Sequence, residues 1–155
     1  MATNFGTFSA TSILTAAQLN NIGGAWTSFT PTWGGITLGS ATNLGRYEQI
    51  GRLCVFQAHL TLSGSTVTGA LTLTLPFTAA RVYSGVYQLV LRDASVGDYV
   101  GIPRQASTTV VTLHAVSSSG SYAVEAATSS TVPFTWTDTD VIYVTGAYET
   151  SADPA

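Results

Sequence analysis

The sequence predicts an all-β protein, an antiparallel β-sandwich or jelly roll of about eight strands with a short N-terminal helix. Two observations support this prediction. Apolar and polar residues alternate in one run after another, as in strands that bury a single face, and turn-forming residues separate these runs at regular intervals. The length of 155 residues suits one domain with a sizeable core. We divide the chain into an N-terminal anchoring segment, residues 1–25, and a β-sandwich head domain, residues 26–155.

The composition is unusually poor in charge. Only 8% of the residues are charged, there is no lysine, and the positive side chains are five arginines. The contents of 45% hydrophobic and 10% aromatic residues nevertheless predict a folded chain. Because an isolated monomer normally carries more charge, we expect part of the surface to be withdrawn into an assembly. The net charge of -3 argues against nucleic acid as a partner.

Neither a membrane nor a secretory signal is indicated. The apolar stretches break within a few residues, so none is long enough to span a bilayer, and we expect no membrane insertion. The N-terminus has no basic region ahead of an apolar one, and we therefore expect no signal peptide.

A short helix is predicted over residues 15–22. Thr15 and Gln18 have the spacing of a capping box, and Gly23 supplies a stop. A helix of two turns is not stable alone in water, so its apolar side chains need a partner surface. That surface is either the chain's own domain or a docking or trimerisation contact, and the absence of charge before Arg46 favours the contact. The apolar side chains that need this partner surface are Leu14, Leu19 and Ile22.

The central β run follows Gly51, where a glycine permits a tight reversal. Alternate residues of this run should face the core, and the opposite face begins apolar at Leu53 and ends polar at Thr61. We therefore expect the strand to start covered on both faces and to end half exposed. The residues of the core face are Cys54, Phe56, Ala58, Leu60 and Leu62. The only cysteine should act as a buried small hydrophobe.

The other β elements are predicted from the same signals. Residues 26–38 read as an edge strand or extended segment around Pro31. Further strands are expected at residues 71–75, 82–91, 99–102, 108–116, 122–126, near 134–136 and at 141–148.

No motif for catalysis, phosphate binding or metal binding is present, so we expect no enzyme, no cofactor and no metal. His59 and His114 stand alone in predicted strands. Asp138 and Asp140 suit a turn better than a calcium site. The aromatic residues either pack in the core or form a platform on which sugars stack. Candidates for stacking are Trp33, Tyr99 and Trp136, with Tyr83 and Tyr87 as further members of such a platform.

Five segments, taken together, resemble small virion domains found in bacteriophage tail-fibre, baseplate and capsid-fibre proteins. They run in order across almost the whole chain. They are Ile13-Leu14-Thr15-Ala16-Ala17-Gln18-Leu19-Asn20; Trp26 with Phe29-Thr30-Pro31-Thr32-Trp33; Gly45-Arg46-Tyr47 with Ile50-Gly51-Arg52-Leu53; Leu73-Thr74-Leu75-Pro76-Phe77; and Gly146-Ala147-Tyr148-Glu149-Thr150.

This resemblance implies a jelly roll of the tumour-necrosis-factor/C1q type, assembled as a homotrimer on the virion without catalytic residues. We expect a tail-fibre or baseplate protein that binds host-surface glycans and contacts other virion proteins. The alternative is a capsid decoration or head-fibre protein attached to the shell. A glycan-degrading enzyme is a third class, which release of reducing sugar would reveal.

The anchoring role of the N-terminal segment can be tested by changing Leu19 and Ile22 to Asp together. The double variant should lose incorporation into virus particles while its β head stays folded, because an unpaired charge is costly to bury. Incorporation is measured by immunoblotting of purified particles, and folding by circular dichroism. Normal incorporation would contradict the docking role.

Overall fold

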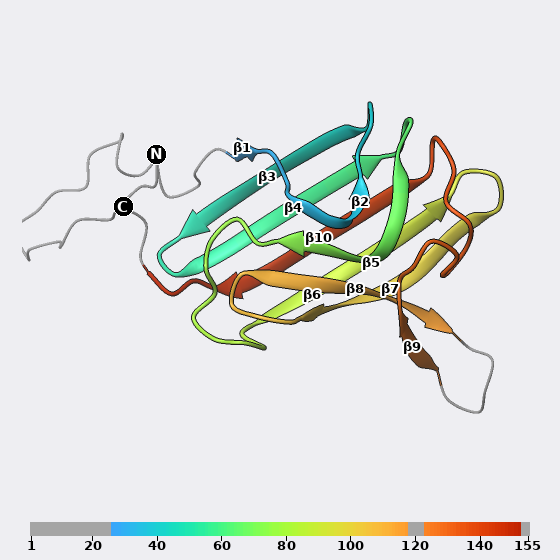
Figure 1. Cartoon of the computed structure of the whole chain (residues 1–155). Coiled ribbons are helices and arrows are strands. Elements are labelled where there is room, and N and C mark those ends of the chain that lie inside the picture. Colours follow the sequence, from blue (N-terminus) through green and yellow to red (C-terminus); the bar gives the residue numbers. More distant parts are fainter. Residues whose placement is uncertain (1–25, 118–122, 153–155) are drawn as a thin grey trace, which may run out of the picture.

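The computed structural model describes residues 26–117 and 123–152, and this part of the chain is all-β (Figure 1). Its strands are β1 (Thr27–Phe29), β2 (Trp33–Thr37), β3 (Thr42–Ile50), β4 (Leu53–Thr61), β5 (Thr66–Thr74), β6 (Gly85–Asp93), β7 (Gly97–Gln105), β8 (Val110–Ser117), β9 (Val124–Ala127) and β10 (Val141–Glu149). The helix predicted at residues 15–22, with Leu14, Leu19 and Ile22, lies outside the described residues. Within the described ranges no helix is long and apolar enough to cross a membrane.

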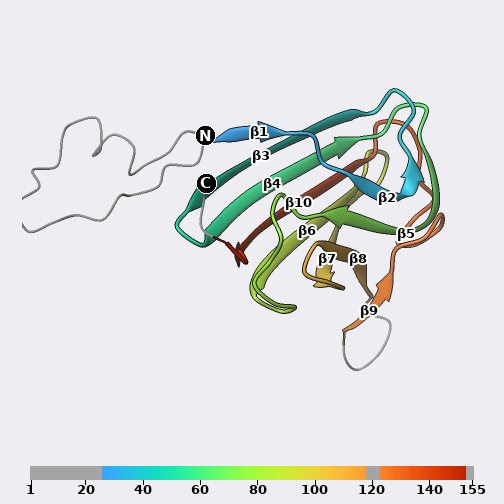
Figure 2. The same ribbon diagram turned by 60° about the vertical axis from the view of Figure 1, so that its left-hand side comes forward.

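All the paired strands are antiparallel and belong to one sheet in the order β1-β3-β4-β10-β6-β7-β8-β5-β2, with β9 beside β8. Hairpins join β3 to β4, β6 to β7 and β7 to β8. The last strand, β10, lies between β4 and β6. Figures 1 and 2 show that the sheet curls strongly, so that β2, β5 and β8 face the strands β4, β10 and β6.

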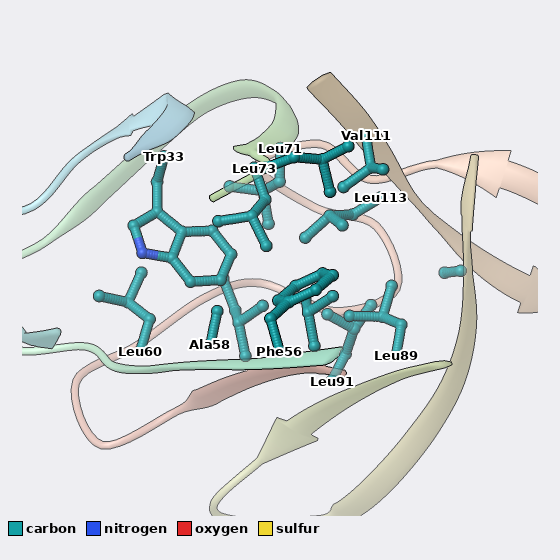
Figure 3. Packing of buried hydrophobic residues seen from close by; sticks show 14 of the residues in the cluster. Trp33, Phe56, Ala58, Leu60, Leu71, Leu73, Leu89, Leu91, Val111 and Leu113 are labelled. Carbon is teal, nitrogen blue, oxygen red and sulfur yellow. The ribbon is translucent and has the colours of Figure 1, made fainter. Parts of the chain in front are cut away.

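The hydrophobic core fills the concave side of this curled sheet (Figure 3). Trp33, Leu71 and Leu113 point into it from one half of the sheet. Phe56 and Leu91 approach them from the other half. Burial of such side chains, at roughly 25 cal/mol per Å² of apolar surface, is the main force that holds the two halves together.

The predicted faces of the central run are confirmed in β4. Its four predicted core residues, and Leu62 directly after the strand, are at most 2% exposed, and the opposite face is partly open to solvent. Gly51 makes the preceding turn with φ of 54°. The expected double cover at the start of the strand was wrong, because Leu53 is 49% exposed. An apolar residue at that position therefore does not indicate burial.

Other sequence-based boundaries needed correction. The segment around Phe134 and Trp136 is not a strand; Pro133 interrupts it, and the Trp136 indole donates to the carbonyl of Ser129 at 2.8 Å. The strand β5 begins at Thr66, well before the predicted position 71. The edge strand predicted around Pro31 is confirmed, since this segment forms β1 and β2 at the two edges of the sheet. The all-β, antiparallel class is confirmed.

A three-residue connection, Thr30-Pro31-Thr32, joins the two outermost strands of the sheet. β1 pairs only with β3 and β2 only with β5 in the described part of the chain. The connection therefore bridges opposite edges of the curled sheet, and we call this region the seam. The backbone of the seam also bonds to β5, where the amide of Thr74 donates to the carbonyl of Thr32 at 2.9 Å.

Asn43 on β3 locks the seam. Its side-chain oxygen accepts a hydrogen bond from the Trp33 indole at 2.9 Å, and its amide nitrogen donates to the carbonyl of Pro31 at 2.8 Å. Gly45 gives the seam room, since a Cβ there would lie 2.7 Å from both Phe29 and Pro31. The aromatic and proline residues of this segment thus serve closure of the sheet.

Replacement of Asn43 by Ala should lower the free energy of unfolding by about 1–3 kcal/mol, because the indole of Trp33 and the carbonyl of Pro31 lose their partner. Chemical denaturation followed by tryptophan fluorescence measures the effect. Thr42→Ala, an exposed change on the same strand, is the control. Equal free energies of unfolding for the two variants would show that the hydrogen bonds of Asn43 do not stabilise the sheet.

Candidate functional site

The three aromatic residues predicted for stacking do not form one exposed platform. Trp33 is only 8% exposed and belongs to the core and the seam. Tyr99 and Trp136 are brought together through Phe134, with ring centroids 5.1 and 4.5 Å from that ring. Both are partly buried against the core. The pair therefore closes one side of the core and offers little free ring surface.

A second set of aromatic residues links segments that lie far apart in the sequence. The rings of Phe29 and Tyr47 are 5.9 Å apart, and those of Tyr47 and Phe77 are 4.8 Å apart, edge to face. The hydroxyl of Tyr148 accepts from the amide of Phe77 and donates to its carbonyl, both at 2.9 Å. We call these four residues the aromatic ladder. They join the start, the middle and the end of the head domain.

The outer side of the sheet carries a pocket of about 350 Å³, here called the outer-face pocket. The pairing register places Leu44, His59 and Tyr143 in one row across β3, β4 and β10. The same pocket is reached by Ser28 of β1, and Gly45, Arg46 and Gln57 complete its lining. Its volume suits a ligand of the size of one or two sugar rings.

The outer-face pocket combines rings with hydrogen-bonding groups. The rings of His59 and Tyr143 meet edge to face at 6.4 Å. Arg46 donates from Nε to Oε1 of Gln57 at 2.8 Å, and its guanidinium lies 4.8 Å from the centre of the Trp26 ring. Four N–H donors of Arg46 are left beyond this bond. Such an arrangement can pack against the apolar face of a sugar and bond to its hydroxyls.

A larger groove of about 630 Å³ lies where β4 and β6 begin and β10 ends, and we call it the end groove. It is lined by Arg52, Leu53, Arg81, Tyr83, Ser84, Gly85, Val86, Ala147, Tyr148 and Glu149. At its rim Tyr83 is 71% exposed and has φ of 64°, a conformation that a bulky residue rarely adopts. A hydrogen bond with Tyr83, followed by the charge of Glu125, raises the pKa of Arg104.

The buried groups behind the end groove are not reactive at neutral pH. Burial raises the pKa of the Cys54 thiol to about 11 and that of Tyr87 to about 12. Cys54 is fully buried and contacts Tyr148, which lines the groove. A neutral, buried thiol is a poor nucleophile, so this cysteine packs as the small hydrophobe that the sequence predicted.

Asp138, Asp140 and His114 lie outside these sites and have local partners. Asp140 is fully buried and accepts from the amides of Ala94 and Thr137 at 2.9 and 2.7 Å. Asp138 accepts from the amide of Gly64 at 2.7 Å. These carboxylates hold turns together. In the part of the chain that the structure describes, no three His, Cys, Asp or Glu residues are grouped as metal ligands.

Sequence reasoning named His59 and Tyr83 but did not place them in pockets. The outward alternation of β4 does put Gln57 and His59 on the same face, and that signal was available. The partners across the sheet, Arg46 and Tyr143, depend on strand order, which alternation does not reveal.

Comparison with known proteins gave no match to a family model, a curated protein or a solved structure.

The strain at Tyr83 can be separated from packing by replacing the residue with Asn, which tolerates positive φ. Tyr83→Asn should leave the free energy of unfolding unchanged or raise it by up to about 1 kcal/mol. Tyr99→Asn removes a partly buried ring that contacts Phe134, and should lower it by about 1–3 kcal/mol. Thermal unfolding of both variants makes the comparison; a clear loss of stability in Tyr83→Asn would mean that the ring is structural.

Proposed function

We propose that this chain is a non-enzymatic bacteriophage structural protein of the virion surface, a homotrimeric tail-fibre or baseplate protein that binds host-surface glycans. The observation that carries the proposal is the aromatic ladder. Its members Phe29, Tyr47, Phe77 and Tyr148 come from four separate segments on which the resemblance to phage virion domains rests. These segments pack as one unit in space, as the proposed shared fold requires.

The finer fold that we propose is a jelly-roll head. Two features support it. The halves of the curled sheet face each other across a single core, and β10 pairs with strands from distant parts of the chain. Both features are typical of jelly rolls, whose strands alternate between two facing layers.

The outer-face pocket is the best candidate for glycan recognition. Tyr143 and His59 supply ring surface, and Leu44 adds an apolar wall. Arg46 and Gln57 supply directional hydrogen bonds, and they already hold each other in place at 2.8 Å. A site that is ordered before the ligand arrives loses less conformational entropy on binding.

Residues 1–25 are proposed to attach the head to a tail or baseplate protein through Leu14, Leu19 and Ile22. The uncharged composition of this segment supports burial in a protein contact. The proposed location is therefore the virion, after assembly in the host cytoplasm. Light scattering after size exclusion should give three times the chain mass of 16.1 kDa.

The second candidate is a capsid decoration or head-fibre protein. The same uncharged anchor segment is compatible with it, because attachment to the shell would also bury this segment in a protein contact. Immunogold labelling of intact particles separates the two, since labels over the whole capsid would exclude the tail location.

Glycan binding is tested by Tyr143→Ala, which removes the largest ring from the outer-face pocket. Affinity for polysaccharide extracted from host cell walls should fall about tenfold, as expected when a ring contact of up to about 1.5 kcal/mol is lost. Isothermal titration calorimetry measures the change.

Val90→Ala is the matched control, because Val90 pairs with Tyr143 on the next strand and does not line the pocket. Equal binding by wild type and Tyr143→Ala would remove the pocket from the proposal. Release of reducing sugar by the wild-type protein would contradict the non-enzymatic assignment.

A further inference from the structure

Arg81 differs from the other arginines in having no side-chain partner in the part of the chain that the structure describes. The others are paired as Arg46 with Gln57, Arg52 with Glu149, Arg92 with Asp98 and Arg104 with Glu125. Arg81 is nevertheless a lining residue of the end groove. With Arg52 it gives the groove two guanidinium groups against the single carboxylate of Glu149, so the formal charge of the lining is positive.

Ser84, three residues further on, carries an unusual hydroxyl. Its Oγ is buried without a hydrogen-bond partner, and it is the only side-chain oxygen or nitrogen of this kind among the described residues. Buried polar atoms are rarely left in this state, because a hydrogen bond that is not made costs stability. Ser84 also lines the end groove. A turn of the Ser84 side chain about χ1 would bring the hydroxyl to the groove, where a ligand oxygen would give it its partner.

The turn that contains both residues is fixed from inside the protein. Gln105 is only 3% exposed. Its amide nitrogen donates to the carbonyl of Arg81 at 3.1 Å, and its oxygen accepts from the amide of Ser84 at 3.3 Å. One buried side chain thus holds the backbone at both ends of the turn. Arg81 and Ser84 are therefore presented on a rigid support.

Tyr83 lies between them and is held in its strained conformation. Its hydroxyl interacts with Arg104, which is itself bound to Glu125 at 2.8 Å. Strained backbone conformations of this kind concentrate at binding sites. The conformation leaves the ring exposed at the rim of the groove, where it can cover the carbon skeleton of a ligand.

We propose that the end groove binds a sugar that carries an oxyanion, a phosphate or a carboxylate. Arg81 binds the oxyanion, Ser84 completes its hydrogen bonding with a ligand oxygen, and Tyr83 packs against the sugar ring. This site is separate from the outer-face pocket, since the two share no lining residue. It does not depend on the proposed virion role.

The test is isothermal titration calorimetry of the full chain with glucose 6-phosphate, glucuronate, glucose and inorganic phosphate. At least one of the two charged sugars should bind, and which of them binds identifies the oxyanion. Glucose and phosphate alone should bind at least tenfold more weakly. Equal affinity for glucose would overturn the role of the oxyanion, and equal affinity for inorganic phosphate would overturn the role of the sugar.

Variants assign the binding to this groove. Arg81→Gln should lower the affinity for the charged sugar at least tenfold. Arg92 is an exposed arginine outside both sites, and Arg92→Gln should leave this affinity unchanged. Ser84→Ala should lower the affinity for the charged sugar several-fold. Arg81 is exposed, so its loss should leave the thermal unfolding midpoint unchanged.

The result is independent of the glycan proposal, because Tyr143→Ala should retain binding of the charged sugar. Unchanged affinity in Arg81→Gln, or absence of binding by both charged sugars, would refute the inference while leaving the outer-face pocket untested by it.

Discussion

The hydrogen-bonded seam between the first two strands is the constraint on which the rest of the structure depends. A curled sheet with two free edges can open, but here three residues tie those edges together, and Asn43 bonds to the connection at Pro31 and to β2 at Trp33. Trp33 is held by this bond at the top of the core, opposite Leu60 and Ala58 (Figure 3). The seam also places Ser28 of β1 beside β3, where it borders the outer-face pocket. Closure, core and pocket therefore share one set of contacts.

The two candidate sites use the same sheet in different ways. The outer-face pocket is made by register, because neighbouring residues of three paired strands stand in one row and none of them is needed in the core. The end groove is made by a turn that a buried amide, Gln105, holds in place. The outer-face pocket combines two rings with the guanidinium of Arg46, which is bonded to Gln57. The end groove contains the guanidinium of Arg81, which has no side-chain partner among the described residues.

Alternation along single strands made the all-β class and the core face of β4 predictable, because burial on one face leaves a period of two residues in the sequence. In the sequence, the seam could be recognised only as a proline with aromatic residues around it. It closes the sheet because β1 and β2 lie at opposite edges, and this depends on strand order. The same reason hid the pairing of Arg46 and Gln57, and of Tyr143 with His59. At 134–136 the apolar pattern was that of a strand, but Pro133 and the Trp136–Ser129 bond set the local conformation. The predicted stacking role of Trp33 was based on residue type alone, which does not indicate whether a side chain is buried.

The central position of β10 has a consequence for how the molecule is made. Residues 141–149 pair on one side with β4 and on the other with β6. The strands β4 and β6 are therefore not hydrogen-bonded to each other, and only β10 connects them. On the ribosome, the hairpin of β3 and β4 and the meander of β6, β7 and β8 emerge first, each with an unpaired edge towards the gap. Unpaired edges of this kind attract strands from other chains. The sheet is therefore completed only after β10 has been synthesised. Nascent chains that lie close together on one messenger RNA would be the most prone to exchange strands or to aggregate.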